Sequence, residues 1–114
     1  MLFRSRLSEY MSDRAAALFR ALSDPTRLQL LQLLRDGELC VCDLMAALRI
    51  PQAKTSRHLG TLKRAGLVTS RKDGLWSYYA LARPRDPLHR KALDCLRELP
   101  LPPALKRRAR CCPT

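Results

Sequence analysis

Apolar residues in the first quarter of the chain recur every three or four positions, which is the spacing of an amphipathic helix. The pattern predicts a first helix from Ser12 to about Leu22. Its apolar face carries Ala15, Leu18, Phe19 and Leu22. A helix with one apolar face must cover either a core or a partner surface.

A second helix is predicted to begin at Asp24-Pro25, because a carboxylate caps the first turn and proline suits the first helical position. Its buried face is expected to hold Leu28, Leu31 and Leu34, and Gly37 is a plausible stop. A short third helix is predicted from Asp43 to Leu48, before a break at Pro51.

The fourth predicted helix, about Gln52 to Arg64, has a basic outer side. Thr55, Leu59 and Leu62 repeat at i, i+4 and i+7 and define its inward face. The outward side carries Ala53, Arg57, Gly60 and Arg64, with Lys54, Thr61 and Ser56 on the flanks. The Arg, Lys, Ser and Thr side chains among these can donate hydrogen bonds to phosphates and base edges. A charged, solvated helix face is, however, common in any protein.

A hairpin is predicted directly after this helix. Asp73-Gly74 separates two β-prone runs, which is a strong hairpin signal, and Arg71 and Lys72 lie near its tip. A basic helix followed by a basic hairpin is the layout of a winged helix, in which the helix enters the major groove and the wing follows the backbone. At strand spacing, Trp76, Tyr78 and Tyr79 are expected to pack the hairpin on the core rather than to stack on bases.

A last helix is predicted to begin at Asp86-Pro87 and to end before Pro100. One of its faces carries Leu88, Ala92, Cys95, Leu96 and Leu99. Little core remains for it to cover, so we expect it to form a homodimer interface with the first helix, including Leu18. The predicted organisation is an arm over residues 1–11, a winged helix-turn-helix domain over 12–99, mainly α with a small β-hairpin, and a basic tail over 100–114.

Composition favours a polyanionic partner, although a merely soluble basic protein, or less readily one that touches an anionic membrane, would have the same charge. The 114 residues carry 22 Lys and Arg against 10 Asp and Glu, a net charge of +12. This excess favours double-stranded DNA through release of counterions, while no apolar run is long enough for a membrane span. The N-terminal residues lack the apolar stretch of a secretory signal, and five cysteines do not form a paired framework. We therefore expect a cytoplasmic protein.

The cysteines are candidate ligands for a soft ion. Cys40 and Cys42 lie at the start of a helix, where the dipole favours thiolates, although they could also be small buried hydrophobes. A third sulfur could come from Cys111 or Cys112 in the tail, or these two could be incidental. Cys95 is expected in the core or the interface.

These stretches resemble the ArsR/SmtB family of metal-sensing repressors over about residues 18–81. The similarity lies in LFRALSDPTRLQLLQLL, ELCVCDLMAALRIPQAKTSRHLGTLKRAGLV and RKDGLWSYYAL, in this order. It implies a winged-helix homodimer that represses its operon and leaves DNA when an inducer binds. With the helix and wing patterns, it gives the expected DNA contacts: Gln52, Lys54, Thr55, Ser56, Arg57, His58, Arg71 and Lys72.

Within this family, ELCVCDL resembles the thiolate site of the arsenic-sensing type, which carries a third cysteine where this chain has Met45. The resemblance implies As(III) or Sb(III) as inducer. Cd(II) or Pb(II) sensing and thiol-redox sensing are the alternatives. An enzyme is not expected, because the sequence has no CxxC, no phosphate-binding loop and no nucleophile–base pair.

Two residues that are two positions apart do not share a helix face. Binding of one ion by Cys40 and Cys42 is therefore expected to hold this turn, immediately before the DNA-reading helix, in a non-helical or distorted form.

Overall fold

The computed structural model describes residues 6–100, with side chains described from residue 12 onward. Its elements, in chain order, are α1 (Arg6–Leu22), α2 (Pro25–Leu33), a 3-10 turn (Leu34–Asp36), β1 (Leu39–Cys40), α3 (Val41–Leu48), α4 (Gln52–Arg64), β2 (Val68–Asp73), β3 (Trp76–Leu81) and α5 (Pro87–Leu96). The predicted class, mainly α with a β-hairpin in winged helix-turn-helix order, is confirmed.

Two Asp-Pro pairs begin α2 and α5 as the sequence predicts. Asp24 has an extended backbone, and its carboxylate accepts the N–H of Arg27 at 3.1 Å. Asp86 accepts the N–H of His89 in the same way at 2.9 Å. Each cap satisfies an N–H that would otherwise lack a partner in the first helical turn.

The first helix is longer than predicted, because it begins at Arg6 instead of Ser12. Residues 6–11, assigned to the arm from sequence, include Arg, Leu, Glu and Met, which all favour helix. Ser12 is therefore an interior position and does not cap the helix. The predicted tail beyond Pro100, with Cys111 and Cys112, lies outside the described residues.

The core is built around α2. The sequence predicted one buried face for this helix, but the structure buries residues on more than one face. Leu30, Leu31, Leu33 and Leu34 are all at most 1% exposed. The cause is the position of α2, because α1, α3 and α4 all contact it. Leu28, predicted to be buried, is only partly so and packs at the edge of this core.

The hairpin belongs to a three-stranded antiparallel sheet of order β1-β3-β2. Its two-residue turn is Gly74-Leu75, one position later than predicted, with Asp73 paired to Trp76 and Gly74 at a φ of 64°. Glycine adopts this left-handed backbone without the steric cost of a side chain. Tyr79 packs against the core as expected, but Trp76 is 37% exposed, so its predicted core role is wrong.

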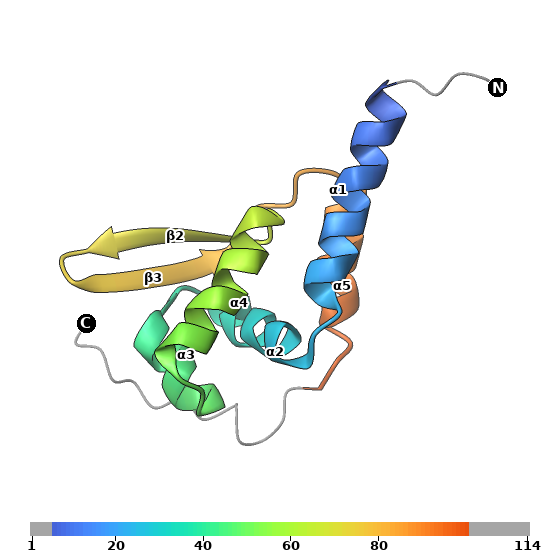
Figure 1. Ribbon diagram of the computed structural model, residues 1–114. Coiled ribbons are helices and arrows are strands. Elements are labelled where there is room, and N and C mark those ends of the chain that lie inside the picture. Colours follow the sequence, from blue (N-terminus) through green and yellow to red (C-terminus); the bar gives the residue numbers. More distant parts are fainter. Residues whose placement is uncertain (1–5, 101–114) are drawn as a thin grey trace.

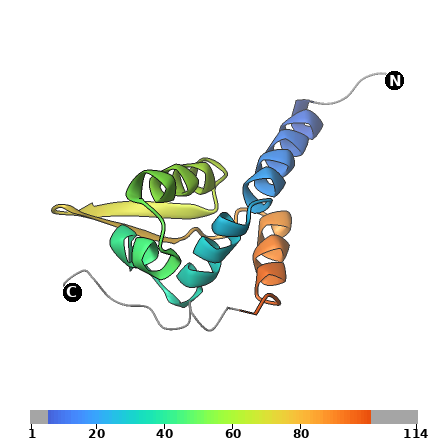
Figure 2. The same ribbon diagram turned by 60° about the horizontal axis from the view of Figure 1, so that its bottom comes forward.

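The hairpin projects away from α1 and α5, and α4 lies between the hairpin and α1 (Figure 1). The turned view shows the same separation, with the hairpin at one end and α1 at the other (Figure 2). No helix within residues 6–100 combines the length and apolar character needed to cross a bilayer. The wing lies beside α4, which contacts β2 (Figure 1).

Candidate DNA interface and thiol site

The DNA-reading candidate, α4, is fixed to the body by its inward residues. Thr55, Leu59 and Leu62 are fully buried, and the Thr55 hydroxyl donates to the Pro51 carbonyl at 2.9 Å. This corrects the assignment of Thr55 to the DNA contacts: its side chain belongs to the core and closes the start of the helix.

Four of the predicted contact residues, Gln52, Lys54, Ser56 and Arg57, are exposed on α4. Within the described part of the chain, neither Lys54 nor Arg57 has a carboxylate at ion-pair distance. Two cations without acidic partners, beside the N–H groups of a helix N-terminus, form a surface suited to phosphate.

His58 is not simply a DNA-facing side chain, because it is half-buried and bonded to another helix. Its Nδ1 lies 3.2 Å from Nη1 of Arg27 and 4.0 Å from the Asp24 carboxylate. Burial and the neighbouring cations lower the pKa of His58, while Asp24 opposes this effect. The ring is therefore held neutral, with Nδ1 accepting from Arg27.

Arg27 joins three elements and was missed by sequence reasoning. Its guanidinium donates to the carbonyls of Ala21 at 2.7 Å and Arg20 at 3.2 Å, besides His58. It thus satisfies carbonyls at the end of α1, and its contact with His58 links that end to α4. The only sign of this role in the sequence was the position of Arg27 in SDPTR, in the first turn after the N-cap Asp24. Burial alone would raise the pKa of Asp24, but the backbone N–H of Arg27 and the charge of its guanidinium lower it overall.

The two DNA contacts predicted on the wing, Arg71 and Lys72, differ in whether an acidic side chain already pairs with them. Lys72 is exposed without an ion-pair partner in the described residues. Arg71 donates from Nε and Nη2 to both oxygens of Glu38, at 2.8 and 2.7 Å, and its guanidinium lies 4.5 Å from the Tyr78 ring centroid. The guanidinium of Arg71 holds the pKa of Glu38 below its usual range. Arg71 is thus already neutralised without DNA, which the sequence did not reveal.

The thiol pair occupies the start of α3. Cys40 is the N-cap, with φ −71° and ψ 149°, and its sulfur accepts the N–H of Cys42 at 3.4 Å. The two Sγ atoms are 2.9 Å apart. Because the N-cap backbone is extended, its side chain can turn back over the first turn. The two sulfurs thus meet because Cys40 is itself non-helical, in line with the expected turn, while α3 begins at Val41, two residues earlier than predicted.

The described residues do not supply a complete metal site. Within residues 12–100, no three Cys, His, Asp or Glu side chains gather in a way that could hold a metal ion. Cys95, expected in the core or the interface, is exposed on α5. A further ligand for Cys40 and Cys42 would have to come from elsewhere in the chain, from solvent or from a partner.

The thiol pair also lies beside the wing, because β1 contains Cys40. Cys40 pairs with Tyr78 of β3, and Leu39 pairs with Tyr79. Glu38, the partner of Arg71, directly precedes this strand. No strand was predicted here, since two residues are too few for a periodic signal. Cys40 therefore contacts both the helix before α4 and the wing.

The predicted dimer surface divides into two sets. Leu18 and Leu96 are buried within the single chain, so they belong to its own core. Leu88 and Leu99 are 38% and 40% exposed, and Cys95 is exposed as well. Phe19 on α1 adds a further exposed apolar side chain. Exposed apolar side chains therefore remain on α1, on α5 and directly after α5.

Comparison with known proteins assigns the family. Residues 24–70 match the family described as bacterial regulatory protein, arsR family. An uncharacterized HTH-type transcriptional regulator of Methanocaldococcus jannaschii is 45% identical over 74 residues, covering 64% of this chain and 83% of that protein.

The names of two relatives refer to resistance to a metal or metalloid. The arsenical resistance operon repressor of Escherichia coli is 52% identical over 66 residues, covering 57% of this chain and 56% of the repressor. The cadmium resistance transcriptional regulatory protein of Listeria innocua is 39% identical over 77 residues, covering 67% and 65%. The chain thus spans little more than half the length of the E. coli repressor.

Among solved structures, the homodimeric winged helix-turn-helix DNA-binding domain from Mycobacterium bovis, a possible ArsR-family regulator, superimposes with a TM-score of 0.71. It is 29% identical, and the match covers 85% of this chain and 87% of that one. These relatives are DNA-binding transcriptional regulators and not enzymes. The chain belongs to the ArsR family of winged helix-turn-helix transcriptional regulators.

Proposed function

We propose that the chain is a dimeric repressor that binds operator DNA without inducer and releases it when As(III) or Sb(III) binds Cys40 and Cys42. The observation that carries this proposal is the contact between the two sulfurs, 2.9 Å apart at the N-terminus of α3. Soft thiolates select soft ions, and As(III) is satisfied by thiolate ligands. The name of the E. coli repressor supports the same inducer class.

Two routes from the thiol pair to DNA binding support the proposal. α3 is followed after three residues by α4, and β1 pairs with the wing. An ion releases DNA only by binding the DNA-free form more tightly, and typical couplings of about 1–3 kcal/mol change affinity about 5–150-fold. This range is sufficient for repression to respond to the inducer.

Fluorescence anisotropy tests this function directly. The reduced protein is bound to labelled DNA from its own promoter and titrated with As(III), Sb(III), Cd(II), Pb(II) and Zn(II). Release by As(III) or Sb(III) at the lowest concentration is expected. Release by Cd(II) or Pb(II) alone would support the alternative inducer, which the cadmium-resistance relative favours. If operator affinity were the same with and without each of these ions, the proposal that the protein senses a metal or metalloid would be overturned.

Arg57 is expected to contact DNA but not the inducer. Arg57→Ala should weaken operator binding by about 1–3 kcal/mol, because alanine offers the DNA no charged donor, and should leave As(III) affinity unchanged. Arg90→Ala is the matched control, since it removes the same charge from an exposed position on α5. Equal weakening in the two variants would show a general charge effect and remove Arg57 from the contact set.

Cys111 and Cys112 are proposed as further ligands. The Cys111→Ser/Cys112→Ser double variant keeps the tail length and charge, and should weaken As(III) binding by at least about tenfold, or 1.4 kcal/mol. Ultraviolet absorbance of the thiolate–arsenic bond would measure this affinity. Unchanged affinity would show that the tail is not part of the site.

The homodimer is proposed to form through the exposed apolar side chains of α1 and α5. Leu88→Glu should convert the dimer to a monomer, because a carboxylate buried without a partner is costly. Leu75→Glu, at the exposed tip of the wing, should leave the dimer intact. Light scattering after size-exclusion chromatography distinguishes the two, and a dimeric Leu88→Glu protein would place the interface elsewhere.

A further inference from the structure

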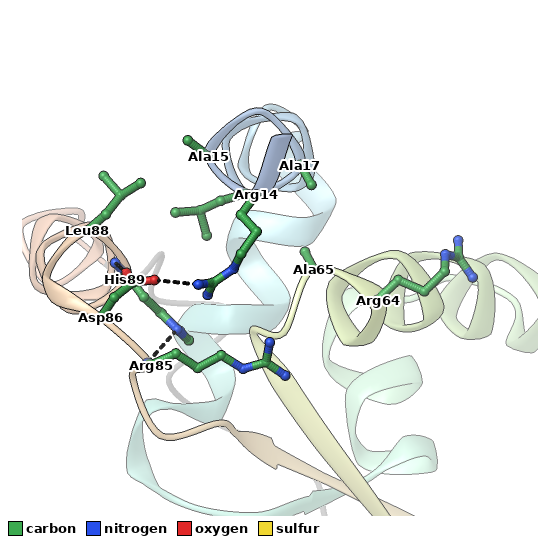
Figure 3. A pocket seen from close by; sticks show the side chains of 10 residues that line it. Arg14, Ala15, Ala17, Arg64, Ala65, Arg85, Asp86, Leu88 and His89 are labelled. Atoms are coloured by element: carbon green, nitrogen blue, oxygen red, sulfur yellow. Dashed lines mark hydrogen bonds and ion pairs between the residues drawn. The ribbon is translucent and has the colours of Figure 1, made fainter. Parts of the chain in front are cut away.

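A second polar site lies away from the thiol pair, in a cavity of about 240 Å³ between α1, the end of α4 and the start of α5. Figure 3 shows Arg14 from α1, Arg85 and Asp86 from the segment before α5, and His89 from α5 itself around it. The His89 ring lies between the side chains of Arg14 and Arg85 in this view. Arg64, which also lines the cavity, points away from His89.

His89 is the least accessible of these groups, with 4% of its surface exposed. Its Nδ1 accepts the backbone N–H of Arg85 at 3.2 Å, so the neutral ring carries its hydrogen on Nε2. Burial lowers the pKa of His89, which favours this neutral form. Within the described residues, Nε2 is buried and has no hydrogen-bond partner. A buried N–H donor without an acceptor is unfavourable.

Asp86 does not accept from Nε2, because Nε2 has no hydrogen-bond partner within the described residues. Oδ1 accepts the backbone N–H of His89 at 2.9 Å, and Oδ2 forms an ion pair with Arg14 at 3.0 Å. These contacts fix the carboxylate at the N-terminus of α5 and hold Arg14 beside the cavity. The N–H on Nε2 must therefore be satisfied by a group from outside this cluster.

Arg85 supplies positive charge without a carboxylate partner in residues 12–100. Its guanidinium rests on Gly66, where an added Cβ would lie 3.4 Å from Cζ. Gly66 also has a φ of +81°, so a side chain there would have a strained backbone. The Arg85 guanidinium thus packs beside the turn at the end of α4.

We propose that this cavity binds a small anion through a phosphate or carboxylate group, which accepts from Nε2 of His89 and pairs with Arg85 and Arg14. The site combines a buried donor that lacks an acceptor with a cation that lacks an anion, and one ligand satisfies both. Because it joins α1, the end of α4 and α5, the ligand would connect the dimer helices to the DNA-reading helix. It does not depend on the thiol site or on the identity of the inducer.

Histidine ring NMR signals of the full chain test the site, because His58 and His89 are the only two histidines. The DNA-free protein is titrated with inorganic phosphate, and separately with succinate, at constant pH and at constant ionic strength set with NaCl. Phosphate, succinate or both should shift the His89 signals at concentrations that leave those of His58 unchanged, and the active anion identifies the ligand group. Equal shifts of both histidines, or no shift with either anion, would overturn the proposal.

Arg85→Gln keeps the backbone N–H that orients His89 and should weaken anion binding at least about tenfold. Arg83→Gln, an exposed residue two positions earlier that does not line the cavity, is the matched control and should bind like the original chain. Unchanged binding by Arg85→Gln, or equal weakening in Arg83→Gln, would contradict the assignment.

Discussion

Cys40→Ser and Cys42→Ser proteins should bind operator with nearly the original affinity and should no longer release it when As(III) is added. Serine keeps the size of the side chain at both positions, and at position 40 its oxygen can replace the sulfur as the cap of α3, so the helix start is preserved. It removes the soft thiolate that the ion requires. With a coupling of about 1–3 kcal/mol, the missing response corresponds to about 5–150-fold in DNA affinity. Anisotropy titrations with and without As(III) measure it.

Cys95→Ser is the control for this pair, because Cys95 is an exposed thiol on α5 outside the proposed site. Its response to As(III) should match that of the original chain. If either Cys40→Ser or Cys42→Ser abolished DNA binding instead of the response, the thiols would be structural and the sensor proposal would fail.

Leu59→Ala should lower the free energy of unfolding by about 2–5 kcal/mol, the range for removing a buried leucine side chain. Leu59 is fully buried and is one of three residues that hold α4 on the core. Substitution would leave a cavity directly beneath the DNA-reading surface, where α2 and α3 also pack. Urea unfolding followed by circular dichroism measures the change.

The measurement needs a fixed protein concentration, since dimerisation adds to apparent stability. Leu75→Ala is the matched control: Leu75 is 99% exposed, so its replacement should change stability by no more than about 0.5 kcal/mol. A decrease below about 1 kcal/mol for Leu59→Ala would show that α4 is anchored mainly by other residues.

Most of the fold was predictable because its signals are local. The Asp-Pro pairs mark two helix starts through a cap and a proline that lie next to each other in sequence. α4 was predicted with its observed bounds, since Pro51 breaks the chain before it and Leu59 and Leu62 repeat at helical spacing. Such features depend on a few neighbouring residues and need no knowledge of tertiary contacts.

The features that sequence reasoning missed depend on residues far apart in the chain. The ion pair of Arg71 with Glu38 spans 33 positions, and the hydrogen bond of Arg27 with His58 spans 31. Thr55 illustrates the same limit, because its residue type suits DNA contact whereas its position in the folded chain places it in the core. Which polar side chain faces outward is decided by packing, and residue type alone does not report it.

The pairing of Cys40 with the wing strand has a consequence for how an inducer would be detected in solution. If the ion displaces this short strand, the wing is no longer supported, and the weakened binding that remains neutralises fewer phosphates and depends on α4. The logarithm of operator affinity would then fall less steeply with the logarithm of salt concentration, by nearly one unit for each phosphate that the wing releases. Preference among operator sequences would change little, so the inducer would alter the ionic character of binding more than its sequence selectivity.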